Sequence, residues 1–129
     1  MTDRGALRDR SDEGQASVEL ALVLPLVATL LLAVVQVGLV VRDQILLTHA
    51  AREAARVAAV DPDPDAAVSA ARAGSGLEAE RLSVEITGRG SAGSRVRVRL
   101  TYAEATDVPL VGALLGDVRL HAEVTMRVE

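Results

Sequence analysis

The sequence contains no cysteine, phenylalanine, tryptophan or lysine, and Tyr102 is its only aromatic residue. Without cysteine, disulfides, thiolate chemistry and Cys-ligated metals are excluded. One aromatic residue forms neither the aromatic belt typical of membrane interfaces nor a platform for stacked bases. The 14 basic residues are all arginine and face 18 acidic residues, and the resulting net charge of −4 argues against a general nucleic-acid-binding protein.

Apolar residues are abundant, and the segment from Leu20 to Val41 contains no charged residue. A helix of about 22 residues is roughly 33 Å long, which is enough to cross the core of a bilayer. The segment is longer than the apolar part of a secretory signal peptide, and no A-x-A cleavage site follows it. We therefore predict a transmembrane helix over residues 15–41 that is retained and contacts membrane lipid.

The orientation of this helix is not fixed by charge. Basic residues flank the apolar segment equally on both sides, with Arg4, Arg8 and Arg10 before it and Arg42, Arg52 and Arg56 after it. The positive-inside rule needs an excess of arginine on one side. Charge alone therefore leaves both orientations open.

A short motif precedes the apolar segment: Gly14, then Gln15 to Val18, then Glu19. This order resembles the processing site of type IV pilin-like proteins, which a prepilin peptidase cuts after the glycine on the cytoplasmic side. The resemblance implies a leader over residues 1–14, a cut between Gly14 and Gln15, and an assembly register set by Glu19. A carboxylate at the edge of hydrocarbon is costly unless paired, and the new amino terminus of a neighbouring subunit is a suitable partner. The alternative is a Glu19 solvated among lipid headgroups.

Two further stretches carry a family resemblance. The run E-x-A-L-V-L-P-L from Glu19, the block A-x-R-E-A-A-R around Arg52, and the ending A-x-V-T-M-R-V-E look like the TadE-like family of pilus assembly proteins. Leu20 departs from the family, whose members often have an aromatic residue directly after the Glu. The likeness covers most of residues 14–60 and 109–129.

The TadE-like resemblance implies a non-enzymatic minor pilin or pseudopilin that assists assembly of a Flp (Tad) pilus. It further implies insertion in the inner membrane, with the N-terminus cytoplasmic and the head extracytoplasmic. The implied partners are a prepilin peptidase, other Tad pseudopilins and the inner-membrane assembly platform. Neither cofactor, nucleic acid nor small-molecule substrate belongs to this function.

The helix is expected to continue beyond the membrane. Ala51, Ala55 and Ala59 recur at intervals of four residues, and neither Gly nor Pro follows before Asp61. This pattern predicts one long helix from about Val18 to Val60, with an alanine stripe that packs inside the subunit. Pro25 removes a backbone donor and is a candidate kink, although a tolerated membrane proline is equally consistent with it.

The remaining residues predict a small α+β head over 42–129, which includes the helix extension 42–60. The acidic run Asp61–Asp65 ends the long helix, and Asp63 with Pro64 caps a short helix that closes at Gly74. Apolar residues then alternate in three strands, beginning near Leu82, Val96 and Val118, with a hairpin at 88–94 between the first two. The fold class is therefore α+β, with a long N-terminal transmembrane helix, a second short helix and a three-stranded antiparallel sheet, as in pilins.

Neither charge nor histidine in the head indicates a catalytic or metal site. Outward Arg95, Arg97 and Arg99 are explained by ion pairs with Glu85 and Glu123 on neighbouring strands. The two histidines, His49 and His121, lack convergent ligands, so we predict no metal and no catalytic residue. The alternative to a pilin is an uncleaved, signal-anchored domain with a binding or sensing role. A membrane-tethered enzyme would need clustered polar residues, which the pattern does not show.

Overall fold

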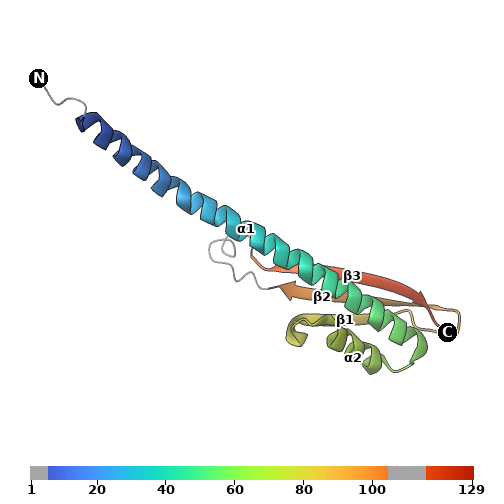
Figure 1. Ribbon diagram of the computed structural model, residues 1–129. Coiled ribbons are helices and arrows are strands. Elements are labelled where there is room, and N and C mark those ends of the chain that lie inside the picture. Colours follow the sequence, from blue (N-terminus) through green and yellow to red (C-terminus); the bar gives the residue numbers. More distant parts are fainter. Residues whose placement is uncertain (1–5, 105–115) are drawn as a thin grey trace, which may run out of the picture. The chain divides into compact units, whose positions relative to one another are not determined.

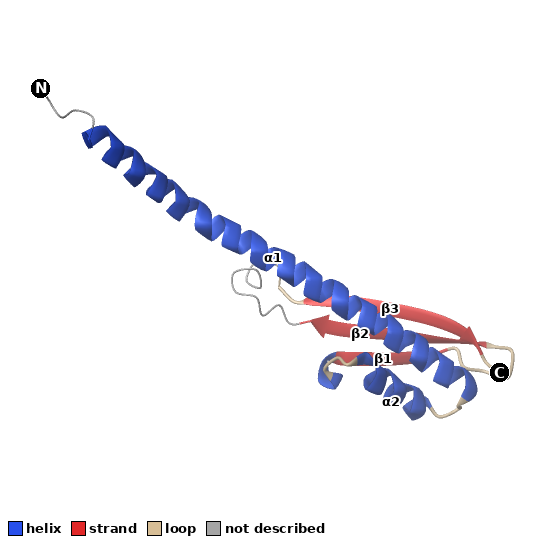
Figure 2. Cartoon of the chain, in the orientation of Figure 1, coloured by secondary structure: helices blue, strands red, loops and turns tan. Residues whose placement is uncertain are grey.

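The computed structural model describes residues 6–104 and 116–129 of the chain. Its elements in chain order are α1 (Ala6–Val60), α2 (Pro64–Ser75), the short 3-10 helix η1 (Ala79–Arg81), β1 (Leu82–Thr87), β2 (Arg95–Glu104) and β3 (Val118–Arg127) (Figures 1 and 2). The predicted α+β arrangement of one long apolar helix, a second short helix and a three-stranded antiparallel sheet is confirmed. The connection between β2 and β3, which the sequence predicts to be long and partly apolar, lies largely outside the described residues.

Helix α1 begins at Ala6, so the predicted start near Val18 was wrong. Residues 6–17 contain no proline to break the helix, so the backbone of this part of the leader joins the same helix. The predicted end at Val60 is confirmed. There the Asp61 amide donates the last bond to the Val57 carbonyl, and Pro62 cannot continue the helix.

The chain divides into two compact units, with the boundary between Val35 and Gln36 inside α1. The second unit, Gln36–Glu129, holds the sheet, α2 and the C-terminal part of α1. Gln36 is only 4 % exposed, and Val40 packs against the core of this unit. The packed head therefore takes in residues at the end of the apolar run. The predicted boundary between 41 and 42 remains a prediction.

The sheet is an antiparallel meander in the order β1-β2-β3. The predicted hairpin at 88–94 joins β1 to β2, and its backbone is held to the C-terminus by bonds from Gly93 N to Val128 O and from Val128 N to Ser94 O. Along β2, side chains alternate strictly between the buried core and the outer face. The period-two pattern in the sequence thus gives the correct strand face.

The core of the head is built from alanines on α1 and branched residues on the sheet. The predicted stripe is confirmed, since Ala51, Ala55 and Ala59 are all buried together with the alanines that precede each of them. The largest fully buried side chains include Leu47 on the same helix and Leu100, Val96 and Val98 on β2. Because these alanines are buried in the core, a larger side chain at any of these positions would overpack it.

Ala55→Leu is expected to destabilise the head by about 1 to 3 kcal/mol, because Ala55 is fully buried and a leucine would overpack a filled interface. The midpoint of thermal unfolding of the full-length chain in detergent should fall by roughly 4 to 8 °C per kcal/mol. Arg52→Leu introduces the same side chain on the exposed face of α1 and is the matched control. Equal melting temperatures for the two variants would contradict the tight packing.

Helix α2 begins as predicted and ends two residues later than predicted. Asp63 is the N-cap, its Oδ1 accepts from the Asp65 amide at 2.9 Å, and Pro64 is the first helical residue. Gly74 lies inside the helix, and Gly76, at a φ of 63°, is the C-cap. The helix continues past Gly74 because Ser75 is buried, and its Oγ both donates to the Arg72 carbonyl and accepts from the Leu77 amide.

Candidate functional site

The residues of the predicted processing motif lie in regular helix near the N-terminal end of α1. Gly14, Gln15 and Glu19 are all exposed. Gln15 and Glu19 are separated by one helical turn and therefore share a face. Among the described residues, the Glu19 side chain makes no hydrogen bond or ion pair. The structure thus leaves the Glu19 carboxylate open to a partner from outside the chain.

Gly14 has no structural role within the chain. It lies in helix, and a Cβ atom added there would meet nothing within 4 Å. Glycine in the interior of a helix costs about 0.5 to 1 kcal/mol relative to alanine. The fold would therefore accept, and the helix would prefer, a larger residue at this position.

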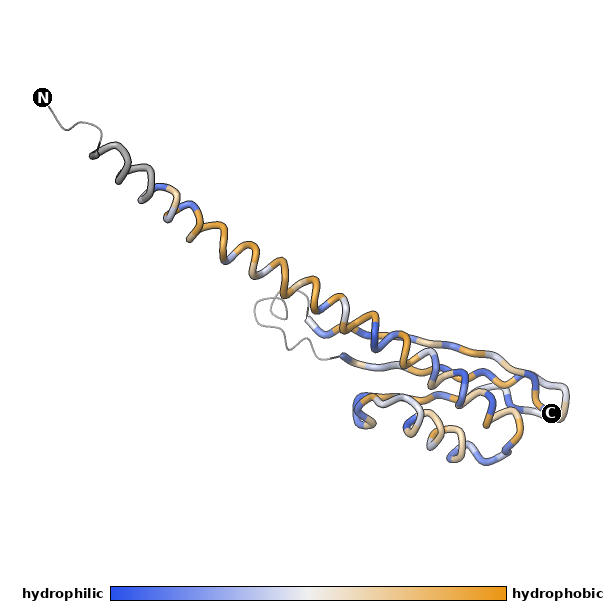
Figure 3. The backbone as a smooth tube through the Cα atoms, in the orientation of Figure 1, coloured by the Kyte–Doolittle hydropathy of each residue, from blue (hydrophilic) through white to orange (hydrophobic). Residues whose placement is uncertain are grey.

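The helix following Glu19 exposes its apolar side chains on all sides. Leu22 and Leu26 are 74 % and 71 % exposed, and the stretch that contains them forms the apolar part of α1 in Figure 3. By length and composition this is the one described helix that could cross a membrane. A helix that is apolar all round and unburied within its own chain requires an apolar environment, which a bilayer provides.

Pro25 lies inside α1, and the helix continues through it without interruption. Thr29 lies one turn after Pro25, and its hydroxyl donates to the Pro25 carbonyl at 2.8 Å. Proline removes a backbone donor, and a hydroxyl bonded back to the preceding turn tends to bend a helix. Both features favour a local bend, and the kink at Pro25 remains a prediction.

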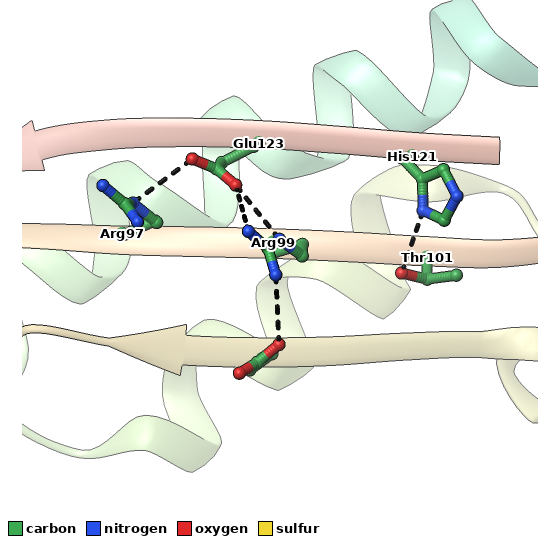
Figure 4. A network of polar contacts seen from close by, with 6 residues as sticks. Arg97, Arg99, Thr101, His121 and Glu123 are labelled. Carbon is green, nitrogen blue, oxygen red and sulfur yellow. Dashed lines mark hydrogen bonds and ion pairs between the residues drawn. The ribbon is translucent and has the colours of Figure 1, made fainter.

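On the outer face of the sheet, arginines and glutamates alternate across strands, as predicted (Figure 4). Arg99 lies opposite Glu85 on β1 and Glu123 on β3, and its Nη2 is 2.8 Å from Glu123 Oε2. Arg97 Nε approaches Glu123 Oε1 at 3.2 Å. The hydrogen bond from Arg99, aided by the charges of Arg97 and Arg99, lowers the pKa of the Glu123 carboxyl. These exposed pairs account for four charged positions on this face, Arg97, Arg99, Glu85 and Glu123, without a ligand. None of the pairs among the described residues includes Arg95, so its predicted ion pair was wrong.

The histidines lie apart from any such cluster. His121 is exposed on β3, with its Nδ1 3.4 Å from the Thr101 hydroxyl, and its backbone carbonyl accepts from Gln44 Nε2 on α1. His49 is exposed on α1. Across residues 14–104 and 116–129, whose side chains the structure describes, no group of three His, Asp or Glu side chains is placed to hold a metal ion.

A buried carboxylate at the end of β2 was not anticipated from the sequence. Glu104 is 7 % exposed, and its Oε2 has no hydrogen-bond partner among the described residues. Burial raises the pKa of Glu104, and the negative charge of Asp43 on α1 raises it further. The signal was present, because Glu104 occupies the inward phase of the alternation that buries Leu100 and Tyr102.

Glu104→Gln is expected to stabilise the head at pH 7 by about 1 to 3 kcal/mol, because it removes a buried charge that lacks a partner. The folded-state pKa of Glu104 is raised. Its contribution to stability is therefore fully present below its unfolded pKa of about 4.3 and is lost as the pH rises through the folded pKa. The variant should therefore be more stable than the wild-type chain at pH values above the folded-state pKa of Glu104. Below the unfolded pKa of about 4.3 this difference in stability should vanish, as measured by denaturant unfolding of the full-length chain.

Glu123→Gln is the matched control for this pH dependence. The pKa of Glu123 is lowered, so its carboxylate stabilises the head above its unfolded pKa, and the amide should remove that contribution rather than add stability. Equal stability of Glu104→Gln and the wild-type chain at pH 7 would show that the Glu104 carboxylate is solvated.

The described residues thus form one candidate membrane-spanning helix and a small α+β head. The family model of TadE-like protein matches residues 14–56, which confirms the resemblance over that segment. The match indicates a Tad pilus-associated pseudopilin, a family that is in general non-catalytic. The likeness at residues 109–129 lies outside the matched segment. No curated protein and no solved structure gave a match.

Proposed function

We propose that this chain is a minor pilin or pseudopilin that assists assembly of a Flp (Tad) type IV-like pilus. The TadE-like match over residues 14–56 carries the proposal. That segment begins at Gly14 and includes Glu19, the apolar helix and its continuation into the head. The function therefore rests on the part of the chain in which motif and family agree.

Processing by a prepilin peptidase after Gly14 is supported by the lack of any internal reason for a glycine there. A Cβ at Gly14 would contact nothing, while glycine weakens the helix by about 0.5 to 1 kcal/mol. A peptidase that approaches the backbone closely supplies a reason, because only glycine leaves the peptide bond uncovered on that side. The cut would release residues 1–14 and make Gln15 the first residue of the mature chain.

Assembly through Glu19 is supported by its exposure and by its lack of a partner among the described residues. In the bilayer a lone carboxylate beside the apolar run is costly, and the ammonium of a neighbouring subunit offsets that cost. The apolar side chains that follow would contact lipid before assembly and related helices afterwards. Glu19 would thereby fix the register of the new subunit.

The proposed topology follows from the processing site. The peptidase acts on the cytoplasmic side, so the N-terminus is cytoplasmic, the helix spans the cytoplasmic membrane and the head is extracytoplasmic. The partners are the peptidase, other Tad pseudopilins and the assembly platform. This function requires no nucleic acid, small-molecule substrate or cofactor.

Intact-mass measurement of the protein, purified from cells with and without the prepilin peptidase, tests the proposal. We expect a chain that starts at Gln15 only when the peptidase is present. An uncut leader on a protein that still supports piliation would overturn it and favour the uncleaved, signal-anchored binding or sensing domain. Immunolabelling of sheared filaments then distinguishes a subunit within the filament from one that only primes assembly.

A further inference from the structure

The outer face of the sheet becomes progressively more basic toward the β1–β2 hairpin. One row across the three strands contains Glu85, Arg99 and Glu123, in which the carboxylates outnumber the arginine. The next row contains Thr87, Arg97 and Thr125, and the last pairs Arg95 with Arg127. Like charges placed directly opposite each other destabilise a sheet. The hairpin end of this face therefore carries positive charge that the fold itself does not require.

Arg95 and Arg127 have no carboxylate partner among the described residues. Arg127 Nε donates to the Gly93 carbonyl at 3.3 Å, and Arg95 is exposed beside it. A hollow of about 690 Å³ opens on this face and is lined by Thr87, Gly88, Arg95, Arg97 and Thr125. A second hollow of about 330 Å³ shares Arg95 and Thr125 with the first. We call this surface, centred on Arg95 and Arg127, the basic end of the sheet.

An acidic segment lies at the same end of the head. Asp61, Asp63 and Asp65 fall within five residues in the connection between α1 and α2 and make no ion pair with described residues. Pro62 and Pro64 fix two backbone φ angles of this connection, and the two Asp–amide bonds restrict it further. Little conformational entropy would therefore be lost when the segment binds a partner.

The two charged surfaces are level with each other but lie on different layers of the head. The Glu129 amide donates to the Ala59 carbonyl, so the end of β3, two residues after Arg127, lies beside the end of α1. The acidic segment continues the helix layer, whereas the basic end faces outward from the sheet. Within one chain the two therefore do not meet. In two chains held side by side by their helices, one surface can face the other.

We infer that a second copy of this chain docks its Asp61–Asp65 segment on the basic end of the sheet of its neighbour. The contact is heterologous, since each copy offers the acidic segment on one side and the basic end on the other, so it can propagate from copy to copy. Exposed ion pairs are individually weak and would not hold free heads together. Anchoring in one membrane raises the effective concentration of the heads to about the millimolar range, where such contacts become populated.

Cross-linking between engineered cysteines tests the contact, and the absence of native cysteine removes background. Two differently tagged full-length chains are co-expressed in membranes, one carrying Val60→Cys beside Asp61 and the other Thr125→Cys in the hollow. Both positions are exposed. We expect a disulfide-linked pair of the two tags. Ser83→Cys, exposed at the far end of the same face, should not link to Val60→Cys.

Charge reversal distinguishes docking from random collision. Arg95→Glu in the Thr125→Cys chain should reduce cross-linking about fivefold, and Asp65→Arg in the Val60→Cys chain should restore it. Arg119→Glu makes the same charge change at the other end of β3 and should leave cross-linking unchanged. Equal cross-linking with and without Arg95→Glu, or with Ser83→Cys and Thr125→Cys, would overturn the inference. The same cross-linking is expected for leader-bearing and mature chains. A failure of this docking contact can therefore be distinguished from a failure of cleavage after Gly14.

Discussion

Gly14→Leu is expected to abolish production of the mature chain, so that the protein accumulates with residues 1–14 attached. A leucine side chain would cover the peptide bond that the prepilin peptidase must reach, where glycine leaves the backbone open. The measurement is the ratio of leader-bearing to mature protein in membranes, by intact mass or by immunoblot. Loss of mature protein should be nearly complete, because the substitution acts at the cut itself.

The structure indicates that Gly14→Leu changes the cut site without disturbing the helix around it. A Cβ at Gly14 meets no other atom within 4 Å, and leucine favours helix more than glycine by about 1 kcal/mol, so the helix should persist. Gly38→Leu is the matched control, since Gly38 is also helical and equally uncrowded but lies beyond the apolar run's midpoint. That variant should be processed normally. Normal amounts of mature protein from Gly14→Leu would reject the processing site.

The head was predictable because its patterns are strong and local. Alternation in β2 places every second residue inward, and the structure buries Val96, Val98 and Leu100 as the sequence indicates. The Arg99 ion pairs also followed, because outward positions on adjacent strands must lie opposite one another. The three strands and the hairpin between the first two leave few other ways for the strands to pair.

Other features depended on competing local preferences or on contacts between distant parts of the chain. The helix starts at Ala6 because nothing in the leader stops it, and a cleavage motif carries no information about backbone conformation. Gly76 rather than Gly74 ends α2 because burial of Ser75 extends the helix. The basic end of the sheet required the register that sets Arg95 against Arg127. Sequence spacing alone cannot supply that register.

Glu19→Gln is expected to preserve membrane insertion and cleavage but to weaken association with neighbouring pseudopilin subunits more than tenfold. A glutamine still accepts a hydrogen bond, yet offers no negative charge to an ammonium at the edge of hydrocarbon. Breaking one partner of a buried pair costs about 3 to 5 kcal/mol, whereas an exposed pair contributes about 0 to 1 kcal/mol. The loss in association constant should therefore be more than tenfold larger if Glu19 pairs with a neighbouring subunit than if it is solvated among lipid headgroups.

Cross-linking in membranes at equal expression measures this loss, with Glu13→Gln as the matched control. Glu13 lies in the leader, so the same chemical change there should alter neither processing nor association. Undiminished cross-linking of Glu19→Gln to its partners would leave Glu19 solvated among headgroups or paired within its own helix. The second arrangement is sterically open, because Gln15 and Glu19 are one turn apart and the new ammonium would lie on the same face. Only pairing between subunits makes the charge of Glu19 necessary for association.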